Sequence, residues 1–436
     1  MVRLEAKRSI ALALFLVLAT LTRVFLWMDV QQWAASWAPL VYSMRGTAWI
    51  VLPVALAAAI WHGGREQRGE VSELFAATPR PRSVRLLPAF LVIVGAAVLA
   101  VAAVLGWAVV VVTGHATYSA GEWPLGVLVG LLAVASVAVL GLGVGRAVPA
   151  PAAAPVGAVL LFLILTVSQM RDGRSANRLL DTVLPMLPVT DEFHRVLPLL
   201  SVAQGVWFAA LGITGVLLTV AATARARALA LAPAVAGVAV GTLLAPSGAI
   251  VPDRQAAALV CTPAESRICV TKVHSNTLPD LVGPAQKVLD VFAKVPGGPK
   301  RVQEEALSHL LDDGKPAGDS ADLTTVRVQL PYRTQEGGIR WDPDTLLAVV
   351  ARNATIDIRC YTGDQEGINA SYAADAIATL LLDGPADRLS PDARKAYDIL
   401  RAIPVEERYP RIGEARKAGL TCGDPLAVVM DQGAGR

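Results

Sequence analysis

Residues 86–112 read LLPAFLVIVGAAVLAVAAVLGWAVVVV, an apolar stretch without a charged side chain. A helix needs roughly 20 mostly apolar residues to cross the hydrocarbon core of a bilayer, so this stretch predicts a transmembrane helix. Further apolar runs on either side of it bring the number of predicted spans to about seven: 9–28, 46–62, 86–112, 124–144, 152–170, 201–222 and 228–244. The expected fold is therefore an all-α membrane domain over residues 1–245.

Composition separates these spans from the rest of the chain. Residues 1–245 contain 17 Lys and Arg against 10 Asp and Glu, whereas residues 246–436 contain 22 against 26. The basic half is also the apolar half, so its positive charge indicates membrane topology rather than nucleic-acid binding, and no nucleic-acid partner is expected. Residues 246–436 are long enough to bury a core of their own and are expected to form a second domain.

Two signals predict the orientation. With a cytoplasmic N-terminus, the inner segments hold eleven Lys and Arg residues and the outer segments six, which agrees with the positive-inside rule. An odd number of spans then places residues 246–436 outside the cytoplasm. All four cysteines lie in that region, which favours disulfides in an oxidising compartment over a metal site. Of three possible pairings, proximity in sequence favours Cys261 with Cys269 and Cys360 with Cys422.

The predicted cytoplasmic loop after the second span reads REQRGEVSELFAATPRPR over residues 65–82. Val71, Leu74 and Phe75 fall at i, i+3 and i+4, the apolar stripe of a short amphipathic helix that would end at Pro79. A cytosolic partner could bind such a helix. The alternative is an ordinary loop lying on lipid headgroups, with its arginines acting as topology signals.

This loop resembles the coupling helix of ABC-2 type transporter permeases, where an Arg/Gly/Glu segment runs into Glu-Leu-Leu-like residues, then Pro and basic residues. The matching stretch comprises Arg68, Gly69, Glu70, Glu73, Leu74, Phe75, Pro79 and Arg82. Phe75 departs from the pattern, because a small aliphatic residue is more usual there. Residues 171–200 are similar to the external helix of the same permeases; the alternative is a connector resting on lipid. The resemblance covers roughly residues 1–225.

The resemblance implies a multi-pass permease subunit in the cell membrane, driven by a separate cytosolic ABC ATPase. Export is expected rather than import, because export is usual in that family. That ATPase would carry ATP and Mg, since this chain has no Walker A sequence; no cofactor or enzymatic activity is expected here. The permease would pair with itself or a second permease among membrane lipids. Its outer domain would gate, receive cargo or bind an extracytoplasmic protein. The architecture resembles actinobacterial permease-like proteins with an appended Cys-containing domain. The alternative is a non-transporting ligand-binding sensor or scaffold.

The C-terminal domain is expected to be mixed α/β (α+β). Alternating and periodic patterns predict strands at 324–330 and 356–360 and helices at 342–352, 369–382 and 390–403. Asp342 and Ser390 are expected to begin the first and the third of these helices. No catalytic or metal motif is found. His274 and His309 are isolated in sequence, which favours a structural or surface role, and the pair Glu304 and Glu305 is interpreted as a solvated helix face.

Two features within the predicted spans remain. Arg23 is a charged residue inside the first span, which makes it a candidate for substrate contact; the alternative is that it reaches the outer headgroups, five residues beyond it. Gly141, Gly143 and Gly145 end the fourth span, where they predict close helix packing rather than a phosphate-binding loop.

Overall fold

The structure is a computed structural model. It describes residues 9–69, 82–169, 177–187, 192–263, 267–306, 322–330, 338–339, 341–361 and 365–431. The chain forms two compact units, Met1–Asp253 and Arg254–Arg436. The division lies shortly after residue 245, where the composition changes.

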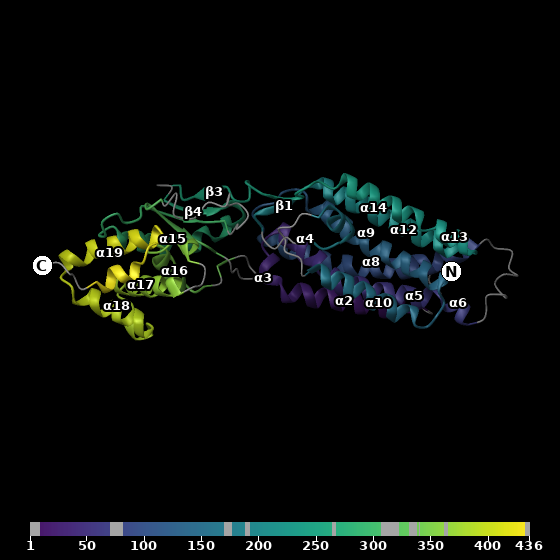
Figure 1. The fold of residues 1–436 in the computed structure, drawn as a ribbon, viewed down its shortest axis with the longest axis horizontal. Coiled ribbons are helices and arrows are strands. Elements are labelled where there is room, and N and C mark those ends of the chain that lie inside the picture. Colours follow the sequence, from purple (N-terminus) through teal and green to yellow (C-terminus); the bar gives the residue numbers. More distant parts are fainter. Residues whose placement is uncertain are drawn as a thin grey trace. The chain divides into compact units, whose positions relative to one another are not determined.

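The first unit is a bundle of helices (Figure 1). They are α2 (Ala11–Met28), α3 (Val30–Trp33), α4 (Trp37–Gly46), α5 (Ala48–Gly63), α6 (Arg65–Arg68), α8 (Arg82–His115), α9 (Trp123–Ala147), α10 (Ala153–Gln169), α11 (Arg178–Val183), α12 (Pro198–Val220), α13 (Ala224–Leu229) and α14 (Ala232–Leu244). A two-stranded antiparallel sheet pairs β1 (His194–Val196) with β2 (Ile250–Pro252). Both strands belong to this unit.

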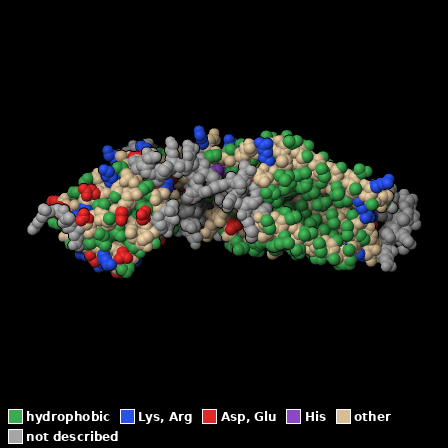
Figure 2. All heavy atoms as spheres, in the orientation of Figure 1, with side chains coloured by type: hydrophobic (Ala, Val, Ile, Leu, Met, Phe, Trp, Pro, Cys, Tyr) green, Lys and Arg blue, Asp and Glu red, His purple; other side chains and the backbone are tan. Residues whose placement is uncertain are grey.

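Several of these helices are long and apolar enough to cross a membrane. By length and composition, five such spans occur in the described residues: α2, the stretch Leu87–His115 of α8, α9, α12 and the combined stretch Ala224–Leu244. The bent pair α4 and α5 would make a sixth. The predicted span at 152–170 is found only as a shorter apolar helix, so the seven predicted spans are not reached. Figure 2 shows hydrophobic side chains covering much of the visible face of this unit, which is compatible with a multi-pass membrane protein.

Helix α9 lies at the centre of the bundle, because it packs against α5, α8 and α12. In the most apolar 18-residue stretch of α9, 61% of the residues are buried, whereas in that of Ala224–Leu244 the buried share is 17%. Its glycines allow close approach, as the sequence predicts. A Cβ at Gly141 would lie 2.7 Å from the Cβ of Ala59, and one at Gly143 would overlap the backbone oxygen of Gly215. The contacts of α9 therefore depend on small residues.

The second unit is built around a four-stranded sheet in the order β3 (Leu259–Cys261), β4 (Ile268–Thr271), β5 (Arg301–Glu304) and β6 (Thr325–Val328). Strands β3 and β4 pair antiparallel, whereas β4, β5 and β6 run parallel. The helices are α15 (Leu278–Phe292), α16 (Pro343–Asn353), α17 (Gln365–Leu381), α18 (Pro391–Ala402), α19 (Val405–Leu420) and α20 (Pro425–Met430). This arrangement confirms a mixed α/β unit and the strand predicted at 324–330.

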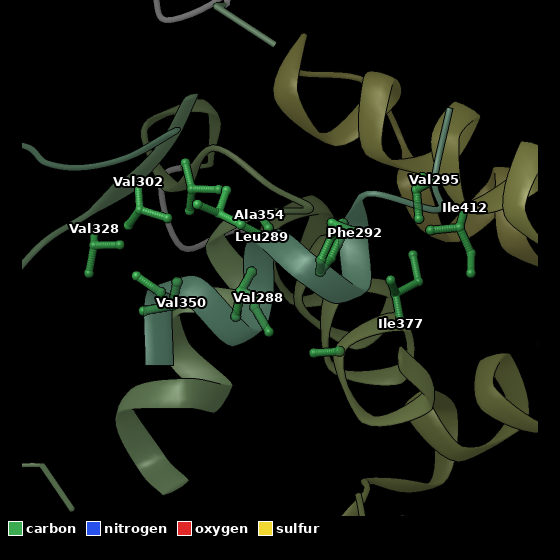
Figure 3. Packing of buried hydrophobic residues seen from close by; sticks show 14 of the residues in the cluster. Val288, Leu289, Phe292, Val295, Val302, Val328, Val350, Ala354, Ile377 and Ile412 are labelled. Atoms are coloured by element: carbon green, nitrogen blue, oxygen red, sulfur yellow. The ribbon is translucent and has the colours of Figure 1, made fainter. Parts of the chain in front are cut away.

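The core of this unit lies between the sheet and its helices (Figure 3). Val288, Leu289 and Phe292 line one face of α15 and are buried together with Val302 and Val328 of the sheet. The predicted helix starts are also confirmed, because Asp342 caps α16 and Ser390 caps α18 through their side-chain oxygens. Capping and apolar periodicity therefore sufficed to locate these helices.

The strand predicted at 356–360 is wrong. Residues Ile358–Cys360 form a 3-10 turn, because the carboxylate of Asp357 accepts hydrogen bonds from the backbone and the guanidinium of Arg359. Side-chain hydrogen bonding within the turn therefore prevails over the β-branched composition of this stretch.

Disulfides join Cys360 to Cys422 and Cys261 to Cys269, which confirms the favoured pairing.

The predicted solvated helix face at Glu304 and Glu305 is also wrong. Glu304 ends strand β5 and is only 1% exposed. Its carboxylate accepts hydrogen bonds from the backbone N–H and the hydroxyl of Thr271 and contacts the ring of His274. This buried network gives His274 a structural role, as predicted, while His309 lies outside the described residues.

Candidate functional site

The candidate site lies at a bend between helices α4 and α5. The two helices meet at Thr47 with an angle of 43° between them. The Thr47 hydroxyl donates to the backbone oxygen of Met44 at 2.7 Å, which satisfies one of the carbonyls left at the end of α4. Arg45 lies in the last turn of α4, directly before this bend.

Arg45 is buried within the bundle. Its side chain is among the largest fully buried ones, and the residue is 2% exposed. Its Nε donates to the backbone oxygen of Pro185 at 2.6 Å and its Nη2 donates to Oε1 of Gln204, also at 2.6 Å. Both acceptors are neutral, and none of the described carboxylates forms an ion pair with Arg45. A buried cation without a counter-charge is costly and is therefore a candidate functional residue.

Gln204 holds the Arg45 site together from the side of α12. It is completely buried, and its Nε2 donates to the backbone oxygens of Asp181 and Leu184 at 2.7 and 3.0 Å. Through Gln204 and Arg45, residues 181–185 are fixed against both α12 and α4. Within the segment compared with an external helix, the described residues include the short helix α11, which packs on α12 and α14.

Arg45 lines a cavity at one end of the bundle, with a solvent-accessible volume of about 50 Å³. The walls come from α4, from residues 118–126 at the start of α9, from the start of α12, and from β1 with the residues before it. Trp37 and Trp123 stack there, with ring centroids 4.3 Å apart. The complete lining is Ser36, Trp37, Ala38, Val41, Tyr42, Arg45, Tyr118, Ala120, Glu122, Trp123, Leu125, Gly126, Leu187, Glu192, Arg195, Val196, Pro198, Ser201 and Asp253.

Polar side chains of the cavity pair with one another. Arg195 forms an ion pair with Glu122 at 2.9 Å, and the Tyr118 hydroxyl donates to Asp253 at 2.8 Å. Burial and the hydrogen bond to Asp253 raise the pKa of Tyr118, so this hydroxyl remains a donor. The carboxylates of Glu122 and Asp253 therefore have partners of their own.

A second, smaller cavity also has Arg45 in its lining. It extends between α5, α8 and α9 and is lined by Arg45, Thr47, Val51, Val101, Gly130 and further apolar residues. Arg45 thus belongs to the lining of both a polar and aromatic cavity and an apolar one within the bundle.

Most of the loop that resembles a coupling helix lies outside the described residues, as do Glu70, Glu73, Leu74, Phe75 and Pro79. For Arg82 only the helical backbone is described.

The start of the loop is well anchored to the bundle. Glu66 forms an ion pair with Arg146 of α9 at 3.0 Å, and the Gln67 side-chain amide donates to the backbone oxygen of Arg146. The Arg68 guanidinium lies 4.4 Å from the ring centre of Trp61 and also donates to the Trp61 backbone oxygen, while Gly69 ends α6. Helix α6 is therefore held on the end of α9.

The structure places Arg23 among tryptophans and outside the lining of the Arg45 cavity. Its guanidinium carbon lies 3.6 Å from the ring centre of Trp107 and 4.7 Å from that of Trp27. Such cation–π contacts offset part of the cost of a charge in apolar surroundings. They give Arg23 a packing role, and the substrate contact considered from the sequence stays a prediction.

Sequence reasoning missed Arg45, which is one of the six Lys and Arg residues assigned to the predicted outer segments. A single Arg at the edge of an apolar run is typical of an interfacial residue, and only its burial distinguishes it. A signal was present in Gln204, a polar residue within the predicted span 201–222. Among the described residues, no group of His, Cys, Asp and Glu could hold a metal ion.

Comparison with known proteins gives no relative. The sequence matches no family model, and searches of curated proteins and of solved structures likewise find no match.

Proposed function

We propose that this chain is a transmembrane permease subunit of the ABC-2 type, in which a separate cytosolic ATPase drives movement of a cargo through the bundle. One observation carries the proposal. Helix α5, which contains Pro53, runs from the bend at Thr47, next to the Arg45 cavity, to Gly63, next to the loop that resembles a coupling helix. A movement imposed on that loop would therefore reach the cavity through a single helix.

Contacts at the loop end of α5 support this mechanical link. A Cβ at Gly64 would lie 2.9 Å from the backbone oxygen of Gly145, so the two backbones are in close contact. The ion pair between Glu66 and Arg146 fixes the same region. Helices α5 and α9 would therefore move together, and α9 also lines the cavity through Trp123 and Gly126.

The two cavities that share Arg45 in their lining support a path for cargo. In the proposed cycle, a change of the bend at Thr47 moves Arg45 and joins the apolar cavity to the polar one. Transport further requires a second permease chain, since ABC permeases are expected by resemblance to act in pairs. Export and an extracytoplasmic second unit are part of the same proposal.

The test is purification of the tagged protein from its native membrane, with identification of associated proteins by mass spectrometry. We expect an ABC ATPase to be recovered with the wild type and lost on the double change Glu73→Ala and Leu74→Ala. The matched control is Arg225→Ala with Arg227→Ala, two residues of the short helix α13 on the same predicted side. Absence of any ATPase, or unchanged recovery with the Glu73 and Leu74 variant, would contradict the proposal.

A second candidate function is a membrane-anchored sensor, favoured by the fact that unit Arg254–Arg436 has its own hydrophobic core and two disulfides. A domain of this kind can bind a ligand without transport. Recovery of extracytoplasmic proteins alone in the same purification would support this function over the permease.

A further inference from the structure

We propose that the cavity beside Arg45 binds an organic anion, in which a carboxylate or phosphate group is attached to an apolar body. The charged group would lie against the Arg45 guanidinium. The apolar body would lie against Trp37, Trp123 and Leu187. Three features of the cavity support this ligand class.

The first feature is the unsatisfied charge of Arg45. A guanidinium has five N–H donors, of which two are used, by Pro185 and Gln204. The described part of the chain offers no acceptor for the other three. Planar oxyanions are the groups that match a guanidinium in charge and in paired hydrogen bonds. An anion at Arg45 would supply both the missing counter-charge and the missing acceptors.

The second feature is that the cavity's own carboxylates do not take this place. Glu122 is paired with Arg195, and Asp253 accepts the hydrogen bond of the Tyr118 hydroxyl. The third carboxylate of the lining, Glu192, forms no ion pair with Arg45, and neither does any other described carboxylate. Within the described residues Arg45 therefore has no counter-charge, and a bound anion would supply one.

The third feature is the aromatic and aliphatic wall. Trp37 and Trp123 stack with their planes 19° apart, and Val41 and Leu125 contribute further apolar surface to the lining. Binding an apolar ligand against this wall removes apolar surface from water, which favours binding roughly in proportion to the area buried. A small hydrated anion would leave this wall uncovered, whereas an anion with an apolar body would cover it.

The binding site does not depend on transport; only the identification of its ligand with the cargo rests on the proposed function. The experiment therefore measures equilibrium binding without ATP or an ATPase. The full-length protein is placed in phosphatidylcholine nanodiscs, and its tryptophan fluorescence is titrated with laurate, with dodecanol and with acetate. Laurate carries charge and chain together, dodecanol the chain alone and acetate the charge alone.

We expect saturable binding of laurate that is at least about tenfold tighter than that of dodecanol or acetate, the size expected for a hydrogen-bonded charge. Arg45→Gln should weaken laurate binding by a similar factor. Arg225→Gln makes the same change at an exposed site and should leave laurate binding unaltered. This variant therefore controls for partition of laurate into the nanodisc lipid. Ala120→Phe narrows the cavity from an irregular segment without touching Arg45 and should also weaken binding.

Several outcomes would overturn the proposal. One is a folded Arg45→Gln protein that binds laurate as the wild type does. Equal affinity for dodecanol would show an apolar pocket without anion selectivity, and equal affinity for acetate would show a site for small anions alone. If the Arg45→Gln protein does not fold, the Ala120→Phe protein provides the test. Unchanged laurate binding by Ala120→Phe would show that laurate binds outside this cavity. Loss of transport with intact binding would count against the permease function only.

Discussion

The Nη2 of Arg45 donates to Oε1 of Gln204 at 2.6 Å, joining helices α4 and α12 through two completely buried polar side chains. The same Gln204 amide donates to two backbone oxygens of the segment after α11. One side chain thus accepts a hydrogen bond from a cation and donates to two carbonyls in the bundle. Removing it leaves all three groups without this partner.

Gln204→Leu is therefore expected to destabilise the bundle by about 3 kcal/mol, because buried polar groups that lose their partners keep their full desolvation cost. Thermal unfolding of the purified protein measures the effect. Ser201→Ala, one turn earlier on α12, is the matched control and should have little effect. An unchanged transition for Gln204→Leu would show that the Arg45 site contributes nothing to stability.

The glycine contacts of α9 give a second prediction. Gly143→Ala places a methyl group against the backbone of Gly215, which cannot move aside as a flexible side chain would. We expect a loss of about 1–3 kcal/mol, the cost typical of overpacking. Gly106→Ala in α8 is the control, since a Cβ there has nothing within 4 Å. It should be neutral or slightly stabilising, and equal transition temperatures for both variants would contradict the packing argument.

The two disulfides should differ in their effect on the second unit. Cys360–Cys422 closes a separation of 62 residues and Cys261–Cys269 one of 8. Loop entropy assigns about 4 kcal/mol to the longer and about 2.5 kcal/mol to the shorter. Replacing both cysteines of each pair by Ser, followed by proteolysis across a urea series, measures the difference. A greater loss from the Cys261 and Cys269 variant would show that strain or residual structure outweighs loop length.

Asp357 should make the second unit sensitive to acid. Burial alone would raise the pKa of Asp357, but the hydrogen bonds and charge of Arg359 and the charge of Arg327 lower it below the ordinary 3.8. Because the folded pKa lies below the unfolded one, the stabilisation is complete above the unfolded pKa and is lost as pH falls through the folded pKa.

Asp357→Asn should therefore flatten the loss of stability on acidification, measured as the unfolding temperature of the full-length chain between about pH 6 and pH 2. Asp398→Asn removes a carboxylate from an exposed helix pair and should leave the profile unchanged. If both variants follow the wild-type curve, the acid response arises at other groups.

Particular residues show what the sequence could and could not predict. Apolar length located the helices, and caps such as Asp342 and Ser390 located their starts, because both signals are local. The turn at Asp357 was missed because side-chain bonding opposes its β-like composition. Arg45 was missed for a different reason: its burial depends on α11 and α12, which lie far from it in sequence. Local patterns do not encode such contacts.

The number of crossings depends on α10, and it can be determined by labelling. All four native cysteines are in disulfides, so a cysteine introduced into the first unit would be the reactive thiol. Val148 is 51% exposed before α10, and Asn177 is exposed after it. If α10 crosses the membrane, Val148→Cys and Asn177→Cys will react with an impermeant maleimide from opposite sides. With a cytoplasmic N-terminus, we expect Asn177→Cys to be labelled in intact cells and Val148→Cys only after lysis. Labelling of both from one side would remove a crossing, and the C-terminal unit would then lie on the same side as the N-terminus.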